Sequence, residues 1–200
     1  MADETPLDRF KRALTGTARA LAREPEVEVA WSADAPTASG KNFRVPLPGR
    51  NLPPEQAREA RGFADSFSLR LRHHNEALHG KGAPAEPVAR ACYDMAEQVR
   101  YEALGANNFG GIRENLDAAV ELRTASDPIV RAQTEGDVPL QTALGLMLRE
   151  RLTGAPARAS TWSANSSRRG PSRTSRRWRS RSTIRRLSSL LRSTCCAISN

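Results

Sequence analysis

Cysteine, aromatic residues and long apolar runs are all scarce in this 200-residue chain. It has three cysteines and an aromatic content of 5%. Cys195 and Cys196 are adjacent, which excludes a disulfide framework and the spaced pairs of a zinc site. Cys92 lies in a helical pattern and is expected to be a small core residue rather than a reactive thiol. Because the chain has no run of about 18 apolar residues and no secretory signal, we expect a cytoplasmic protein without a membrane segment.

Acidic residues are missing from the last part of the chain. Residues 155–200 contain eleven Arg and no Lys, Asp or Glu. Residues 1–154 carry 20 basic and 22 acidic side chains, so the net charge of +9 and the pI near 10.6 come from the tail alone. We therefore predict one folded domain over 5–154 and a disordered Ser/Arg-rich tail over 155–200. The tail has no carboxylates to pair its arginines and little apolar surface to offset the cost of ordering.

Hydrophobic periodicity predicts a mainly α domain with a small β hairpin near the N-terminus. Thr5 is expected to cap a helix over about 6–23. Alternation over 27–31 and 43–48 predicts the two strands of the hairpin, and the prolines of the second would put it at an edge. Further helices are expected in PPEQAREARGFADSFSLRLRHHNEALH, AEPVARACYDMAEQVRYEALGA, GIRENLDAAVELR and DVPLQTALGLMLRERLTG, the last ended by Gly154.

Motifs for catalysis and nucleotide binding are absent or weak. The phosphate-binding pattern G-x-x-x-x-G-K-[ST] does not occur, and GANNFGG follows no strand, so it predicts a loop with left-handed glycines. The arginines of REARGFADSFSLRLR predict a solvated helix face rather than a phosphate groove. We therefore assign no catalytic residue and no cofactor-binding residue.

One cluster has the chemistry of metal ligands, the segment HHNEALH with His73, His74, Glu76 and His79. It lies near the end of a long predicted helix. On such a helix His74 and His79 are five residues apart, which lacks the i, i+4 spacing of helical ligand pairs. We therefore expect a solvated helix end and assign no metal ligand, while a small helical enzyme that uses these histidines stays an open alternative.

Five segments of the body resemble one known family and occur in the family's order. They are PLDRFKRALTGTARALA, EVEVAW, GFADSFSLRLRHHNEALH, DMAEQVRYEALGANNFGGIRENL and ALGLMLRERLTG. The family is CobT, the T subunit of the aerobic, ATP-dependent cobaltochelatase. Its most specific feature here is the run E-x-x-R-x-E-A-x-G-A, Glu97 to Ala106. Members usually carry His-Asp where this chain has His74 and Asn75.

The resemblance implies a non-catalytic subunit of the complex that inserts cobalt into a corrin, hydrogenobyrinic acid a,c-diamide, in cobalamin biosynthesis. It implies two partners, an AAA+ ATPase subunit and a large chelatase subunit. ATP, Mg²⁺ and cobalt are used by the complex, and no cofactor is expected on this chain. In the family an acidic linker and a von Willebrand A-like domain follow the helical module. Because the D-x-S-x-S motif of that domain is absent, we expect a chain truncated before it and inactive alone.

The abrupt end of the resemblance near Gly154 admits two hypotheses. The first is a frameshift near residues 153–158. In the alternative frame, TCN serine codons give Phe, Leu, Ile or Val and CGN arginine codons give Ala, Pro, Ser or Thr, so a Ser/Arg tail becomes a helix-like sequence. The second is a genuine basic arm, which would make the chain a nucleic-acid-binding protein with a helical body.

Overall fold

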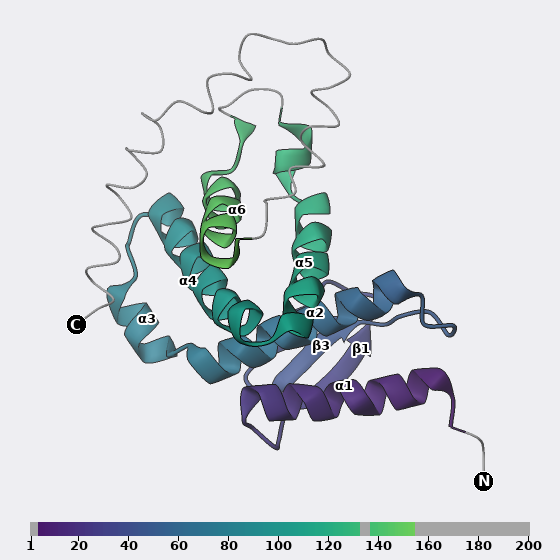
Figure 1. The fold of residues 1–200 in the computed structure, drawn as a ribbon. Coiled ribbons are helices and arrows are strands. Elements are labelled where there is room, and N and C mark those ends of the chain that lie inside the picture. The colour runs from purple at the N-terminus through teal and green to yellow at the C-terminus, as the bar shows by residue number, and fades with distance from the viewer. Residues whose placement is uncertain (1–3, 133–136, 155–200) are drawn as a thin grey trace. The chain divides into compact units, whose positions relative to one another are not determined.

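The computed structural model describes residues 4–132 and 137–154 (Figure 1). Its elements are α1 (Pro6–Ala22), β1 (Glu28–Ser32), β2 (Thr37–Ser39), β3 (Asn42–Pro46), α2 (Pro54–His73), α3 (Glu76–Gly82), α4 (Pro87–Asn108), α5 (Gly110–Ala125), the 3₁₀ helix η1 (Pro128–Arg131) and α6 (Leu140–Thr153). The described part is mainly helical with a small sheet near the N-terminus, which confirms the predicted fold class. The predicted disordered tail, 155–200, lies outside the described residues.

Helix α1 begins and ends close to the predicted residues. Thr5 Oγ1 accepts a hydrogen bond from the Asp8 N–H at 3.2 Å, and the Asp8 carboxylate accepts from the Thr5 N–H at 3.3 Å, which makes a capping box. Arg23 adopts the left-handed region at φ 56° and ends the helix. The buried face of α1 consists of Phe10, Leu14, Ala18, Leu21 and Ala22.

The sheet has three strands in the order β1-β3-β2, which corrects the predicted hairpin. The two predicted strands, β1 and β3, are present but run parallel, with Val29 opposite Phe43. The strand β2, which the sequence analysis missed, pairs antiparallel with β3 and places Ala38 opposite Phe43. β3 is therefore the central strand and not an edge strand. Its proline is tolerated because Pro46 is the last residue of the strand.

Helix α2 lies at the centre of the described domain (Figure 1). α1 and the sheet pack along one side of it, and α4 and α5 pack along the other. The core on the first side joins α1, β3 and α2 through Phe10, Leu14, Val45, Ala60, Phe63 and Ala64. The core on the second side joins α2, α4 and α5 through Leu69, Tyr101, Ala106 and Leu116.

Two glycines set the distances between these helices. Gly62 on α2 lies against α5, and a Cβ there would collide with the backbone carbonyl of Asn115 and lie 2.9 Å from Cβ of Ala119. Gly105 on α4 lies beneath Leu69 of α2, and a Cβ there would lie 3.1 Å from its Cγ. The close approach of α2 to α4 and α5 therefore depends on the missing side chains at these positions.

Two helix boundaries differ from the predicted ones. The long helix expected through HHNEALH ends at His73, and Asn75 caps the separate helix α3 by accepting a hydrogen bond from the Leu78 N–H at 3.0 Å. Leu78 is consequently 68% exposed. Only Phe109 separates α4 from α5, so the predicted GANNFGG loop is almost entirely helical and its glycines do not adopt left-handed φ.

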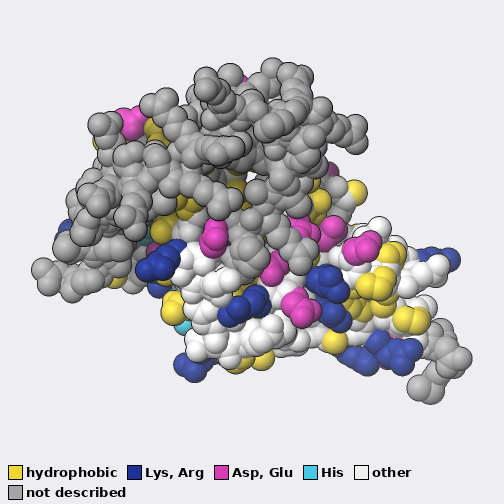
Figure 2. Space-filling view, turned by 45° about the horizontal axis from the view of Figure 1, so that its top comes forward, with side chains coloured by type: hydrophobic (Ala, Val, Ile, Leu, Met, Phe, Trp, Pro, Cys, Tyr) yellow, Lys and Arg dark blue, Asp and Glu magenta, His cyan; other side chains and the backbone are white. Residues whose placement is uncertain are grey.

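The surface of the described domain mixes charges of both signs. On the face shown in Figure 2, Lys and Arg side chains are interspersed with Asp and Glu, in keeping with the near-zero charge of residues 1–154. The described part of this face therefore lacks the broad basic patch typical of nucleic-acid-binding domains.

The helices of the described residues are too short or too polar to cross a lipid bilayer.

Candidate functional site

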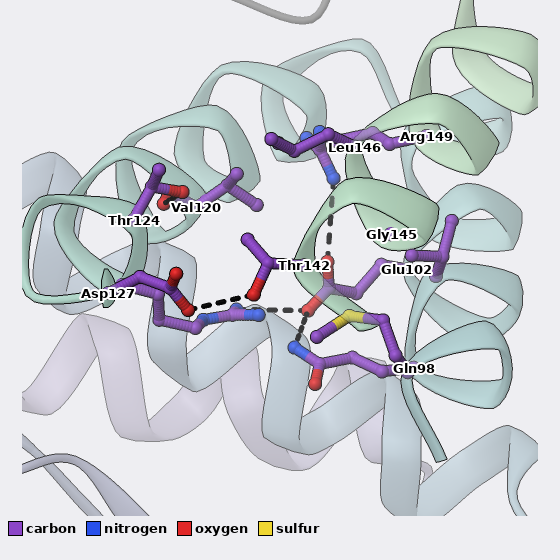
Figure 3. Close-up of a pocket in the computed structure, with 12 residues that line it drawn as sticks. Gln98, Glu102, Val120, Thr124, Asp127, Thr142, Gly145, Leu146 and Arg149 are labelled. Carbon is purple, nitrogen blue, oxygen red and sulfur yellow. Dashed lines mark hydrogen bonds and ion pairs between the residues drawn. The ribbon is translucent and has the colours of Figure 1, made fainter. Parts of the chain in front are cut away.

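A carboxylate with four hydrogen-bond donors around it lies between the helices (Figure 3). Glu102 on α4 is 1% exposed. Its Oε1 accepts from Ser66 Oγ on α2 at 2.6 Å and from Gln98 Nε2 at 3.1 Å. The same oxygen accepts from Arg123 Nη2 on α5 at 2.9 Å, while Oε2 accepts from Arg149 Nη1 on α6 at 3.4 Å. One buried charge thereby joins α2, α4, α5 and α6.

The position of α6 depends on this network. Arg149 is 6% exposed, and besides Glu102 it contacts Asp117 of α5, with 2.7 Å between Nη2 and Oδ1. At the other end of α6, Thr142 Oγ1 donates to Asp127 Oδ2 at 2.8 Å. Because buried charges and hydroxyls need partners, these contacts specify one orientation of α6 against α4 and α5.

These side chains line a cavity of about 80 Å³ between α4, α5 and α6 (Figure 3). Small-molecule sites usually enclose roughly 300–1,000 Å³, so the cavity is too small for a nucleotide or a tetrapyrrole. The Glu102 carboxylate is also occupied by its donors. The arrangement is therefore suited to holding the helices together and not to binding a substrate.

No role was predicted for the Glu102 network from the sequence. A signal was present, because Glu102 lies on the apolar face of α4, three residues after the buried Val99 and next to the buried Ala103. A charged residue within such a stripe predicts a buried partner. The identity of the partners, Arg123 and Arg149, could not be read from spacing, since they lie 21 and 47 residues away.

The structure brings together two of the three histidines that the sequence analysis singled out. His74 follows the end of α2 and His79 lies in α3, and their ring centroids are 4.8 Å apart. Their side chains are 8% and 11% exposed. The prediction of a solvated helix end is therefore wrong for both. The continuous helix assumed there is interrupted at Asn75, and α3 turns its histidine toward α4. His73 is half-buried. Its pKa is lowered, mainly by burial and then by the positive charges of nearby arginines.

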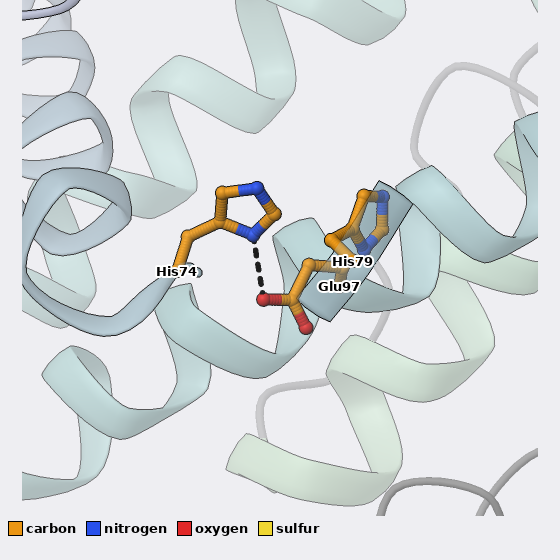
Figure 4. A group of neighbouring side chains, drawn as sticks. All are labelled: His74, His79 and Glu97. Atoms are coloured by element: carbon orange, nitrogen blue, oxygen red, sulfur yellow. Dashed lines mark hydrogen bonds and ion pairs between the residues drawn. The ribbon is translucent and has the colours of Figure 1, made fainter. Parts of the chain in front are cut away.

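Carboxylates surround the two imidazoles. His74 Nδ1 lies 2.8 Å from Glu97 Oε1 (Figure 4). Its Nε2 lies 3.2 Å from Glu76 Oε2. His79 Nε2 lies 2.7 Å from Asp94 Oδ1. Burial acts to raise the pKa of Glu97, but its hydrogen bonds with Arg100 and His74 outweigh burial, so the pKa is lowered. Glu97 is therefore an anion held against the histidine pair.

Other residues that the sequence analysis named have structural roles. Arg70 pairs with Glu76 at 3.4 Å, and Arg72 Nη1 donates to the carbonyl of Leu21 at 3.3 Å near the end of α1. These two arginines are therefore engaged within the chain. Cys92 is half-buried, and burial raises the pKa of its thiol, which disfavours the reactive thiolate.

Asp65 is a buried acid at the contact between α2 and α5. It is 2% exposed and accepts a hydrogen bond from Asn115 Nδ2 at 2.8 Å. Burial raises its pKa to about 6, although this hydrogen bond and the charge of Arg61 act to lower it. In an unfolded chain the pKa of this carboxyl is near 3.8, so the unfolded state loses the proton at a lower pH than the folded state does.

Asp65→Asn is expected to stabilise the protein at neutral pH. The ionised carboxylate of Asp65 lowers the stability of the wild type as the pH rises from about 4 to about 6, by up to about 3 kcal/mol for a shift of roughly two pKa units. Asparagine has no such ionisation, and its amide oxygen can still accept from Asn115. Urea denaturation at pH 4 and pH 7.5 tests this: the gain should appear at pH 7.5 and vanish at pH 4. An equal effect at both pH values would contradict it.

A family model described as cobalamin biosynthesis protein CobT matches residues 4–165. The chain belongs to the CobT family. This confirms the resemblance found in the sequence and implies a role in cobalamin biosynthesis, as part of a cobaltochelatase. No solved structure matches the chain. The match includes every element of the described structure and ends inside the Ser/Arg-rich tail.

The most specific CobT-like segment, Glu97 to Ala106, supplies the principal contacts described above. Glu97 and Arg100 are paired beside the histidines, with 2.7 Å between Arg100 Nε and Glu97 Oε2. Glu102 is the centre of the buried network, and Gly105 allows α4 to approach α2. In this CobT chain the segment therefore determines how four helices pack. Asn75 caps α3 with its side-chain oxygen, and an aspartate at this position would supply the same acceptor.

Proposed function

We propose that residues 5–154 are the N-terminal helical module of the T subunit of an ATP-dependent cobaltochelatase. The complete enzyme inserts Co²⁺ into the corrin ring of hydrogenobyrinic acid a,c-diamide, with ATP and Mg²⁺ used by the complex. The module binds the AAA+ ATPase subunit in the cytoplasm and carries no catalytic residue. Chelation takes place on the large chelatase subunit.

The family match is the observation that carries this proposal. Two features of the described residues support a structural role for the Glu102 network. The cavity beside Glu102, about 80 Å³, is far below the size of a corrin. The CobT-like segments in α2, α4 and α6 are joined by the Glu102 network, as expected of a rigid binding module. Arg58 on α2 is exposed, and we propose that it contributes to the contact with the ATPase subunit.

We further propose that the residues after about 158 are a frameshifted continuation of the family sequence. The support is compositional: eleven Arg occur without one acidic residue between 155 and 200, while the preceding domain is almost neutral. In the alternative frame this composition corresponds to a helix-like sequence rich in Leu, Ala and Asp. The nucleotide sequence over codons 150–200 tests it directly, since stop codons in that frame would contradict the proposal.

Cobalt insertion by a reconstituted complex tests the function. The large chelatase subunit, the ATPase subunit, ATP, Mg²⁺, Co²⁺ and the corrin acceptor are mixed with either the 200-residue chain or a version with the reading frame restored. We expect insertion with the restored chain and none with the 200-residue chain, measured by the change in corrin absorbance. A restored chain without activity would contradict the proposed function, and turnover by the 200-residue chain would contradict the proposed frameshift.

The alternative function is nucleic-acid binding through the arginines of 155–200. A titration of duplex DNA against the full chain at several salt concentrations separates the two functions. We expect only weak, salt-sensitive binding without sequence preference, because the described domain is nearly neutral. Tight binding that prefers one sequence at physiological salt would favour the alternative.

A further inference from the structure

Three side chains with metal-ligand chemistry converge where α2, α3 and α4 meet. One nitrogen of His74, one nitrogen of His79 and one carboxylate oxygen of Glu97 lie within 4.8 Å of one another (Figure 4). We propose that these three residues bind a divalent first-row transition-metal ion such as Zn²⁺ or Co²⁺. This site is distinct from the metal-ion adhesion site expected in the family's later domain, and it does not depend on the proposed function.

The interruption of the helix creates the site. At His74 the backbone leaves helical geometry, with φ −100° and ψ 135°, and Asn75 starts α3 as its cap. On one continuous helix, residues five apart point in different directions. The turn at His74–Asn75 instead brings the two imidazoles into edge-to-face contact above Glu97. The ligands therefore come from the residue that follows α2, from α3 and from α4, which hold the site from separate directions.

The donor set suits a borderline metal ion. Two imidazoles and one carboxylate form a common ligand set for Zn²⁺, and Co²⁺ accepts the same nitrogen and oxygen donors. Three protein ligands leave a further coordination position for water or a second molecule. Mg²⁺ and Ca²⁺ prefer oxygen ligands alone, so the two histidines select against them.

Each proposed ligand is held by a neighbour of the kind found around metal centres. His74 Nε2 lies 3.2 Å from Glu76, and His79 Nε2 lies 2.7 Å from Asp94. This leaves Nδ1 of each ring for the metal. Among the described residues His79 Nδ1 has no hydrogen-bond partner, whereas His74 Nδ1 is bonded to Glu97 Oε1, so the metal would replace the proton between these two atoms. Carboxylates on the outer nitrogens of ligating histidines fix the ring orientation and raise ligand basicity. Arg100 holds Glu97 through both oxygens at 2.7 Å.

The three ligand atoms lie within 4.8 Å of one another, so they need to move only a short distance to reach a common metal ion. Metal–nitrogen bonds of about 2.0–2.1 Å place tetrahedral donors about 3.3 Å apart. His74 Nδ1 and Glu97 Oε1 are already 2.8 Å apart, so the main adjustment is at His79. That residue belongs to the seven-residue helix α3, none of whose residues is buried. A shift of α3 can therefore bring the His79 nitrogen to the metal without disturbing the core.

Isothermal titration of the full chain with Zn²⁺ tests the site, with Mg²⁺ as the control ion. Wild type is expected to bind one Zn²⁺ per chain and no Mg²⁺. His79→Gln should abolish stoichiometric binding while leaving the fold intact, and Asp94→Asn should weaken binding by about 10–100-fold. The matched control is His73→Gln, which changes a neighbouring histidine outside the cluster and should bind like the wild type.

Co²⁺ provides a second, geometric readout. The wild type and His73→Gln should give the visible absorption of a cobalt ion bound by nitrogen and oxygen in fewer than six-coordinate geometry, and His79→Gln and Glu97→Gln should not. Circular dichroism confirms that each variant is folded. If the wild type fails to bind Zn²⁺, or if folded His79→Gln binds it as tightly as the wild type, the cluster is a hydrogen-bond network only and the proposal is wrong.

Discussion

Replacing Glu102 by alanine is expected to lower the free energy of unfolding by about 3–5 kcal/mol. The carboxylate is 1% exposed and accepts hydrogen bonds from Arg123 and Arg149. Its removal takes the anion from Arg123, whose side chain is 32% exposed, and one of two anions from the buried Arg149. Arg149 is itself 6% exposed and would keep only Asp117. Urea denaturation at pH 7 measures the loss.

Two further variants separate charge from packing. Glu102→Gln keeps the shape and an acceptor oxygen but removes the negative charge, so its effect should be smaller than that of the alanine variant. Glu114→Ala removes an exposed acid from α5 and should change stability by less than about 0.5 kcal/mol. Equal effects of Glu102→Ala and Glu114→Ala would contradict the central place of Glu102.

Gly62→Ala is expected to destabilise the domain by about 3 kcal/mol or more, at the upper end of overpacking costs. The added methyl group would collide with the backbone carbonyl of Asn115, and a backbone atom cannot rotate away. The contact of α2 with α5 would have to open, which also disturbs the hydrogen bond between Asn115 and Asp65. The thermal midpoint and the urea midpoint should both fall.

Gly16→Ala is the matched control for this substitution. Gly16 also lies inside a helix, α1, but nothing lies within 4 Å of a Cβ added there. Alanine has the higher helix propensity, so the control should be stabilised by about 0.5–1 kcal/mol. Opposite signs for the two substitutions are the expected result. Destabilisation of similar size in both would show that close packing at Gly62 is not the cause.

Local features of the fold could be predicted from the sequence. Thr5 and Asp8, which are three residues apart, specify the start of α1 through their capping box. Gly154 ends α6 in the left-handed region, at φ 68°. The pairing of β1 with β3 could not be predicted. The two strands are parallel and β2 lies between them in the chain, so no short turn joins them and marks the pair. The positions of β1 and β3 were therefore predictable, whereas the presence of β2 and the direction and order of the strands were not.

The Glu102 network and the histidine cluster could not be predicted from the sequence, for different reasons. Three of the four partners of Glu102 come from other helices, and only the folded chain brings them together. The histidine pair depends on one local event, the helix interruption at His74–Asn75. Asn75 is a favoured cap residue, so this interruption had a sequence signal. The apolar periodicity on either side of it was the stronger pattern and predicted a continuous helix.

Binding of the chain to the AAA+ ATPase subunit of cobaltochelatase tests the central claim most directly. Sedimentation velocity of the 200-residue chain with that subunit, in the presence of ATP and Mg²⁺, is expected to show a complex. A chain ending at Gly154 should bind equally well, and Arg58→Glu should weaken the complex. A folded chain that forms no complex, or binding that requires residues 155–200, would contradict the assignment of residues 5–154 as the module that binds the ATPase subunit.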